Sequence, residues 1–251
     1  MPEGDAVRRT ARRLDAALTG QVLTRTDLRV PAFATVDLSR GEVVGTRSRG
    51  KHLLTRIDHE SGRWTLHTHL RMDGSWRVLR PGQRWPKPAY QARAVLSTAS
   101  VQAVGFLLGE VDLWRRSEEE TRLAYLGPDL LGPDWDEPEA LRRLLAAPEE
   151  PVFEALRDQR KLAGVGTIYA AEALYVTGVH PLTPVGSVPD LERLVRRTRQ
   201  MLDAEWSRTG RMWVYGRKAC RRCGTTVQVL RVGPPGQERP AYLCPACQPE
   251  R

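Results

Sequence analysis

The four cysteines of the chain have the type and spacing of a metal site. They fall into two Cys-x-x-Cys pairs, separated by 20 residues of β-compatible sequence, so the pairs would face each other across a hairpin. Structural zinc is held by four such ligands at about 2.3 Å, with no position left open for water. We predict one structural Zn²⁺ ion and keep a redox pair as the alternative; the expected ligands are Cys220, Cys223, Cys244 and Cys247.

A second reactive candidate stands at the start of the chain, which reads MPEGD. A small residue such as Pro2 permits removal of Met1, so we expect a secondary amine beside the carboxylate of Glu3. A terminal amine has a pKa of about 8, against about 10.4 for lysine, and is therefore the better nucleophile near neutral pH. A frayed, unreactive terminus is the alternative.

The stretch LRDQRKLAGVGTIYAAEALY predicts two helices joined by a tight turn. Gly164 and Gly166 break the first helix, and the second begins near Thr167. The N–H groups and the dipole at a helix start attract phosphate, and Lys161 lies just upstream. Paired glycines are also common between the helices of ordinary bundles, so both interpretations stay open.

Helices and strands must position these candidate site residues, and the spacing of apolar residues along the chain predicts where those helices and strands lie. After MPEGD, apolar residues at helical spacing predict a helix that stops at Gly20; short alternating runs then continue to about Trp114, as in an antiparallel sandwich or barrel. We expect this domain over 1–118 and a Pro-, Gly- and Asp-rich hinge over 119–135. Helices should fill 136–210, and the cysteine hairpin 211–251.

The charge of the chain points to a polyanionic partner. Lys and Arg number 39 and Asp and Glu 30, giving +9 and a pI near 9.9. The segment 211–251 alone carries eight basic and two acidic residues, although a solvated basic face is the alternative. No apolar run approaches the roughly 18 residues of a membrane span, and no apolar signal core opens the chain. We expect a cytoplasmic monomer without a membrane partner.

Seven segments together resemble the Fpg/Nei family of bifunctional DNA glycosylases, especially its endonuclease VIII-like branch. They are MPEGD, SRGKHLL, HLRMDGSW, LGPDLL, LRDQRKLAGVGTIYAAEALY, YGRKACRRCG and RPAYLCPACQ. The resemblance implies an α+β fold, with an N-terminal β-sandwich flanked by helices, then an all-helical helix-two-turn-helix domain with a C-terminal zinc β-hairpin. It also implies base excision repair of DNA that contains oxidised bases, chiefly pyrimidines, or abasic sites, with β,δ-elimination at the abasic site.

The resemblance assigns a catalytic role to four residues. Pro2 would attack the sugar carbon C1′ and form a Schiff base, and Glu3 would move protons as the ring opens. Lys51 would bind phosphate near the lesion and assist β-elimination, while Arg239 would assist the second, δ, elimination. Taken alone, Lys51 and Arg239 could equally be solvated surface charges.

The resemblance also implies which residues contact DNA. Met72 matches a wedge that fills the space of an extruded base, with Arg71 facing the opposite strand; a core methionine is the alternative. Gly166 and Thr167 match the phosphate-binding helix start, where most relatives have Asn in place of Thr167. Lys161 and Arg239 are also expected at DNA. The region GFLLGEVDLWRR lacks the arginine loop of the formamidopyrimidine branch, which favours the endonuclease VIII branch.

Two other classes of protein compete with this interpretation. A non-catalytic, zinc-containing protein of the same fold that binds damaged DNA would not need Pro2 and Glu3. A tautomerase with an N-terminal proline would use the amine as a base, but such proteins resemble small barrels without zinc or a basic tail.

Three further residues remain without an assigned role. His67 and His69 share one face of an expected strand, but no carboxylate or cysteine motif lies near them in the sequence. We therefore expect packed or surface histidines rather than a second metal site. Glu172 lies on the helix that begins near Thr167; a hydrogen bond within the DNA-binding cleft and an exposed helix surface are both open.

Overall fold

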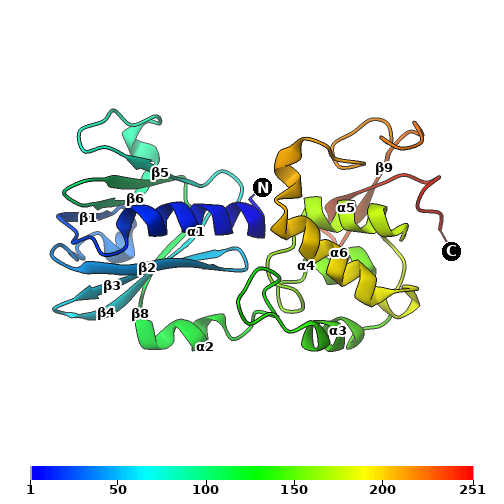
Figure 1. Ribbon diagram of the computed structural model, residues 1–251, viewed down its shortest axis with the longest axis horizontal. Helices are drawn as coiled ribbons and strands as arrows, with labels where there is room; N and C mark the ends of the chain where they lie inside the picture. The colour runs from blue at the N-terminus through cyan, green and yellow to red at the C-terminus, as the bar shows by residue number, and fades with distance from the viewer. Residues whose placement is uncertain (1, 251) are drawn as a thin grey trace. The chain divides into compact units, whose positions relative to one another are not determined.

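The computed structural model describes residues 2–250 of the chain. Two compact units divide it, Met1–Ala124 and Tyr125–Arg251, and the boundary lies inside the predicted 119–135 hinge segment. Figure 1 shows strands predominating in the first unit and helices in the second.

Two antiparallel four-stranded sheets form the first unit (Figure 1). The first sheet has the strand order β1 (Arg25–Leu28), β6 (Ala92–Ser97), β7 (Gln102–Phe106) and β5 (Ser75–Leu79). The second has the order β2 (Glu42–Arg49), β3 (His52–His59), β4 (Gly62–His69) and β8 (Glu110–Arg115). The sequence predicted a sandwich or a barrel, and the structure is a sandwich.

The helix α1 (Gly4–Leu18) packs with both sheets into one core. Its buried side chains recur every three or four residues, namely Val7, Ala11, Leu14 and Leu18. They join apolar residues from the inner faces of both sheets, such as Leu53 and Leu96. Gly20 has the positive φ of 76° that follows a helix end, as the sequence predicted. Short 3₁₀ turns lie at η1 (Pro31–Phe33), η2 (Ala89–Gln91) and η3 (Arg116–Glu118).

A buried carboxylate fastens the end of the first unit to the second sheet. Glu119 begins α2 (Glu119–Leu123), and its side chain is 3% exposed. It accepts hydrogen bonds from Arg56 Nη2 at 2.6 Å, from Arg47 Nη2 at 2.8 Å and from the Thr65 hydroxyl. Two guanidinium groups and a hydroxyl therefore replace the water that this charge loses on burial.

The second unit is built around α5. Its helices are α3 (Glu137–Leu145), α4 (Val152–Arg157), α5 (Thr167–Thr177) and α6 (Leu191–Asp203), with 3₁₀ turns η4 (Val185–Ser187) and η5 (Trp206–Thr209). Every residue of α5 from Tyr169 to Tyr175 is buried, whereas α3 and α6 bury one face each. A helix that is apolar all round belongs in the interior.

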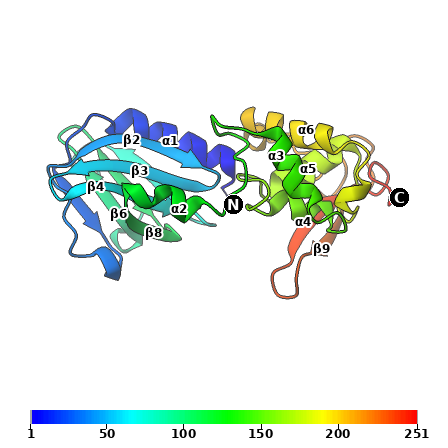
Figure 2. The ribbon, with the colours of Figure 1, turned by 90° about the horizontal axis from the view of Figure 1, so that it is seen from below.

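A two-stranded hairpin follows the helices of the second unit. It pairs β9 (Gln228–Val232) with β10 (Arg239–Leu243), and Figure 2 shows it projecting from the helices. The predicted fold, a β-sandwich followed by a helical domain with a cysteine-bearing hairpin, is confirmed. Among residues 2–250, none of the helices has the length and hydrophobicity of a bilayer-spanning helix.

Candidate active site and metal centre

Pro2 and Glu3 lead directly into α1. Glu3 is the N-cap residue, with an extended backbone, and its carbonyl accepts a hydrogen bond from the Val7 amide at 3.0 Å. The Glu3 residue is only 2% exposed, and Asp5 in the first turn is buried too. Carboxylates are favoured at the positive end of a helix dipole. The described start of the chain is therefore packed, while Met1, whose removal the sequence predicts, lies outside the described residues.

A cavity of about 630 Å³ lies beside Pro2. Its walls come from α1, from β5, and from the loop between β4 and β5 at Leu70 and Gly74. Three basic side chains line it as well, those of Arg9, Arg13 and Arg77. Their charge favours an anionic occupant. The cavity therefore joins Pro2 to both ends of the loop that carries Arg71 and Met72, while Arg71 and Met72 themselves line a separate cavity.

Met72 lies in that loop and is 63% exposed, so the alternative of a core methionine is wrong. Arg71 has a positive φ of 51°, and its backbone N–H donates to His69 Nδ1 at 3.0 Å. The Arg71 guanidinium forms an ion pair with Glu110. A Cβ atom added to Gly109 would overlap the Arg71 side chain, so the loop rests closely on the start of β8.

Lys51 occupies the two-residue turn between β2 and β3. Gly50 has a positive φ of 56° and Lys51 does not, which is the signature of a type II′ turn. Lys51 is 9% exposed, and its charge acts on His52 and His69, which also feel the charge of Arg71. The structure thus groups two predicted site residues, Lys51 and Arg71, around these histidines.

Three histidines and two carboxylates share one face of the second sheet, which we call the histidine face: His52, His67, His69, Glu110 and Asp112. The expectation of a packed histidine is confirmed, because His67 is 3% exposed. No carboxylate motif lies near it in the sequence, but the fold brings one close, since Asp112 Oδ2 is 3.2 Å from His67 Nδ1. Burial lowers the pKa of His52 to about 3 and that of His69 to about 4, so both rings are neutral at pH 7.

In the second unit, α5 begins where the sequence predicted a phosphate site. Gly166 is the N-cap residue, and Thr167 is the first residue of the helix and 7% exposed. The helix dipole places positive partial charge at this end. Lys161, expected to lie toward phosphate, is largely buried and forms an ion pair with Glu150.

Gln159 organises the turn before α5, a role that sequence reasoning missed. Its amide nitrogen donates to the carbonyls of Arg157 at 2.7 Å and Val165 at 2.8 Å. Its carbonyl oxygen accepts from the amide of Gly164 at 3.0 Å, where the backbone φ is 107°. One side chain thereby fixes both ends of the glycine turn, and only its place in the LRDQRKLAG stretch could have suggested this.

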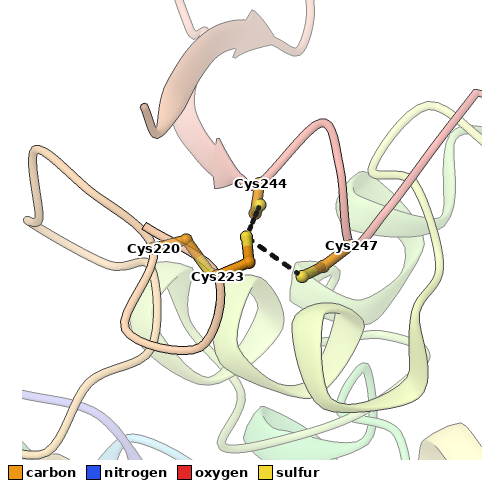
Figure 3. Close-up of side chains that lie close together, drawn as sticks. All are labelled: Cys220, Cys223, Cys244 and Cys247. Atoms are coloured by element: carbon orange, nitrogen blue, oxygen red, sulfur yellow. Dashed lines mark hydrogen bonds between the residues drawn. The ribbon is translucent and has the colours of Figure 1, made fainter. Parts of the chain in front are cut away.

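The four cysteines gather at the base of the hairpin, as Figure 3 shows. Cys223 Sγ lies 3.5 Å from Cys244 Sγ and 3.6 Å from Cys247 Sγ. Sulfurs 2.3 Å from one tetrahedral zinc would lie about 3.8 Å apart, so the donor set and its spacing fit that ion. The amides of Arg222 and Cys223 donate to Cys220, as expected around a thiolate that carries charge.

The end of α5 supports this cluster. The Tyr175 hydroxyl lies 3.3 Å from Cys220 Sγ and 3.8 Å from Cys247 Sγ. Gln248, which is fully buried, accepts from the Cys244 amide at 3.1 Å and donates to the Val179 carbonyl at 2.8 Å. Both cysteine knuckles are therefore tied to α5 or to Val179, two residues beyond its end.

Glu172 ties the chain that enters the hairpin to the middle of α5. Its carboxylate is fully buried and accepts from the backbone amides of Trp213 at 2.8 Å, Val214 at 2.9 Å and Tyr215 at 2.9 Å. The Trp206 indole donates to it as well, at 3.3 Å. Glu172 is thus not a helix-surface carboxylate; three successive amides stabilise its charge.

Arg239, the predicted elimination residue, is the first residue of β10. It pairs with Val232 across the hairpin and is exposed. The structure therefore groups Pro2 with the Met72 loop and Lys51 with Arg71 in the first unit. In the second, it connects Thr167 to the cysteine cluster through α5.

Comparison with known proteins identifies the family. Residues 1–107 match the family model of the formamidopyrimidine-DNA glycosylase N-terminal domain. Over 262 residues the chain is 49% identical to "Probable endonuclease 8 2" of Streptomyces coelicolor, an alignment covering 99% of this chain and 94% of that protein. The chain belongs to the Fpg/Nei family. Its members are DNA glycosylases and abasic-site lyases of base excision repair.

Two further comparisons agree with that membership. The chain is 46% identical to "DNA-(apurinic or apyrimidinic site) lyase Nei2" of Mycolicibacterium smegmatis, with 99% of each chain covered. The fold matches the crystal structure of Lactococcus lactis formamidopyrimidine DNA glycosylase bound to DNA with an abasic site. The TM-score is 0.82 at 21% identity, over 99% of this chain and 100% of that one. The Fpg/Nei fold therefore extends over both units.

Proposed function

We propose that this Fpg/Nei protein excises oxidised bases, chiefly pyrimidines, from DNA and cleaves the strand at the resulting abasic site. The observation that carries the proposal is the position of Pro2, which precedes the packed helix α1 and lines a basic cavity together with Leu70 and Gly74, the two ends of the loop that carries Met72. A mature chain that starts at Pro2 offers a nucleophilic amine there. The relatives named as an endonuclease 8 and an abasic-site lyase support the same class of reaction.

The first step is attack of the Pro2 nitrogen lone pair on C1′ of the damaged nucleotide. The bond from C1′ to the base breaks, and the base leaves with the electron pair and takes up the proton that the Pro2 nitrogen releases. The nitrogen lone pair then expels O4′ from C1′, and Glu3 protonates O4′ as the sugar ring opens. Because the proline nitrogen is secondary, the product is an iminium ion that is cationic without further protonation. Glu3, adjacent in the chain and buried at the helix start, supports this assignment.

The iminium then draws electrons from the sugar. Loss of a C2′ proton breaks the C3′–O bond and releases the downstream strand, and loss of the C4′ proton breaks the C5′–O bond. In this proposal, Lys51 holds phosphate and assists the first elimination, and Arg239 assists the second. The nearly buried turn of Lys51 and the exposed position of Arg239 at the start of β10 support these roles.

The proposal also assigns the contacts to DNA. Met72 serves as the wedge that offsets the few kcal/mol lost when a base leaves the stack, and its exposure supports this role. Arg71 faces the opposite strand, and the α5 start at Gly166 and Thr167 binds phosphate. To bind phosphate, Lys161 would have to break its ion pair with Glu150 and bind a phosphate oxygen instead.

We also propose that the four cysteines hold one structural zinc ion. Four thiolates fill its coordination sphere, so the ion would shape the hairpin rather than activate water. The preference for pyrimidines is supported by the segment between β7 and β8, where Leu107 and Leu108 stand in a loop without arginine.

Borohydride trapping tests the mechanism. The full-length chain is incubated with duplexes containing one oxidised pyrimidine or one abasic site, reduced, digested and mapped by mass spectrometry. We expect one adduct, on a peptide that begins with Pro2. Besides the terminus, the chain offers four amines, so mapping is decisive; they are Lys51, Lys87, Lys161 and Lys218.

Variants sharpen the trapping experiment. Pro2→Gly, which keeps a terminal amine but makes it primary, should reduce trapping, whereas Lys87→Arg should leave it unchanged. Retention of Met1 in fully active protein, or an adduct on any lysine, would contradict the proposal. An oxidised purine processed faster than an oxidised pyrimidine would overturn the substrate assignment alone.

A further inference from the structure

The histidine face places metal-ligating groups in two adjacent rows. His52, His69 and Glu110 stand opposite one another across β3, β4 and β8, and His67 and Asp112 form the neighbouring row. Because side chains two residues apart in a strand lie on the same face, all five point to one side of the sheet. The fold thus brings together residues from three separate parts of the sequence.

His52, His67 and Glu110 lie as close together as the ligands of one metal ion. His52 Nδ1 and His67 Nε2 are 2.8 Å apart. One nitrogen of each ring and a Glu110 carboxylate oxygen all lie within 4.8 Å of one another. Nitrogens bound about 2.1 Å from a tetrahedral ion lie about 3.4 Å apart. The two nitrogens would therefore need to move apart by only roughly half an ångström to bind one ion.

His67 is held in the orientation that a metal ligand needs. Its Nδ1 lies 3.2 Å from Asp112 Oδ2, and its ring stacks on Trp114 with the centroids 4.2 Å apart. A carboxylate at one ring nitrogen fixes the proton there and turns the other nitrogen's lone pair outward; metal-bound histidines usually have this arrangement. Here the outward lone pair, on Nε2, points to His52.

We propose that His52, His67 and Glu110 form a second metal site, with Asp112 as the carboxylate that supports His67. Two imidazoles and one carboxylate suit a divalent transition ion such as Zn²⁺, Co²⁺ or Ni²⁺, whereas Mg²⁺ and Ca²⁺ prefer oxygen ligands alone. The side chains of Glu110 and Asp112 are 32% and 46% exposed, so an ion can enter from their side of the cluster.

Occupancy of this site would affect the neighbouring loop. Glu110 is also the partner of Arg71, so an ion that takes this carboxylate weakens the hold on the Arg71 guanidinium. Resting on the proposed function, we infer that metal binding alters the grip on damaged DNA, because Arg71 belongs to the wedge loop.

Metal titration without DNA tests the site independently of any activity. The full-length chain, saturated first with one zinc per molecule, is titrated with Co²⁺ and followed by calorimetry and absorption spectroscopy. We expect one further ion per chain, with the visible bands of nitrogen and oxygen ligation and no sulfur charge-transfer band. Absence of a second ion, or a spectrum showing thiolate ligation, would overturn the proposal.

Variants locate the ion. His67→Gln should abolish the second binding event, and Asp112→Asn should weaken it about 10- to 100-fold. His59→Gln, at the far end of β3, is the matched control and should bind as the wild type does. If His67→Gln fails to fold by circular dichroism, Asp112→Asn decides, because Asp112 is half exposed. Equal affinity in Asp112→Asn and wild type would contradict the site.

Binding to abasic DNA provides the second readout. Adding Co²⁺ to the zinc-saturated chain should change its DNA affinity several-fold, and the same addition should have no effect on Asp112→Asn at metal concentrations below its weakened affinity. A DNA effect of equal size in both proteins would contradict the link to Arg71. Failure of metal binding would leave the trapping results on Pro2 untouched, and failure of trapping would leave the metal titration untouched.

Discussion

At the scale of single residues, Tyr175 connects a helix to the cysteine cluster. Burial raises the pKa of its hydroxyl, and the adjacent thiols raise it further, so the proton stays in place. The hydroxyl can therefore donate to Cys220 and Cys247. A donor to a coordinating sulfur orients the ligand and tunes its charge.

Removing this hydroxyl should weaken zinc binding. We expect Tyr175→Phe to lower the affinity for zinc about 10-fold or more, as loss of such a supporting group commonly does. Competition with a chromogenic chelator measures the change. Tyr242→Phe is the control, since Tyr242 lies in β10 and its ring packs on that of Tyr215, with the ring centroids 4.9 Å apart. Equal affinity in Tyr175→Phe and wild type would show that the hydroxyl plays no part.

Some single residues could be assigned from sequence and others could not. The four cysteines follow from spacing alone, because both knuckles are local motifs. Lys161 looked like an available cation, yet its partner Glu150 lies 11 residues away and no local pattern announces the pair. Glu172 finds its three amide partners more than 40 residues further along the chain. The roles of Pro2 and Lys51 stay predictions.

At the scale of elements, α5 serves three purposes along its length. Thr167 begins it at the proposed phosphate site, Glu172 holds the chain entering the hairpin, and Tyr175 touches the cysteine cluster. The helix is buried on nearly every side, and close packing holds it in one position. Thr167, Glu172 and Tyr175 are therefore held at fixed distances from one another.

Neutralising Glu172 should loosen the approach to the hairpin. Glu172→Gln keeps the shape but removes the charge that three amides stabilise, and we expect a loss of roughly 3 kcal/mol in the unfolding free energy of the second unit. Hydrogen exchange at residues 213–215 should rise more than elsewhere. Glu192→Gln, on the exposed side of α6, should change stability by less than about 0.5 kcal/mol. Unchanged exchange at 213–215 would contradict the role.

The carboxylate that begins α2 gives the first unit a defined acid sensitivity. Burial alone would raise the pKa of Glu119, but hydrogen bonds from Arg56 and Thr65 outweigh it and lower the value from 4.5 to about 2. Because the pKa of Glu119 is lower in the folded than in the unfolded state, its ionised carboxylate stabilises the fold fully above about pH 4.5. This stabilisation is lost as the pH falls towards 2.

Denaturant unfolding of the full chain between pH 6 and pH 2 should reveal this linkage. We expect the wild type to lose roughly 3 kcal/mol more than Glu119→Gln as the pH falls from about 4.5 to about 2. Glu118→Gln, at the neighbouring exposed position, should follow the wild-type profile. Parallel profiles for wild type and Glu119→Gln would refute the assignment.

At the scale of the whole molecule, the excess of nine positive charges should make DNA binding strongly dependent on salt. Each neutralised phosphate contributes about −0.9 to the slope of log affinity against log salt concentration. We expect Arg239→Gln to reduce the magnitude of this slope by about 1. Arg25→Gln is the control, because Arg25 already pairs with Asp27. A slope unchanged by Arg239→Gln would remove Arg239 from the DNA interface.

The order of elements was predictable because its signals are local: alternation for strands, helical spacing for helices, and two knuckles for the hairpin. The histidine face was not. In the second sheet β8 lies beside β4, while the strands between them in sequence, β5 to β7, all belong to the other sheet. Glu110 and Asp112 thereby come to lie beside His67 and His69 through a register that no sequence pattern specifies.

The turn at Gly50 and Lys51 has no spare residue. One inserted amino acid would displace the lysine, and an insertion taken up within β3 would also turn His52 from the histidine face toward the core, because neighbouring side chains in a strand alternate. The length of this hairpin connection is therefore constrained twice, by the phosphate contact proposed for Lys51 and by the position of the His52 ring. Homologous chains that vary freely in their surface loops should keep the length of this one.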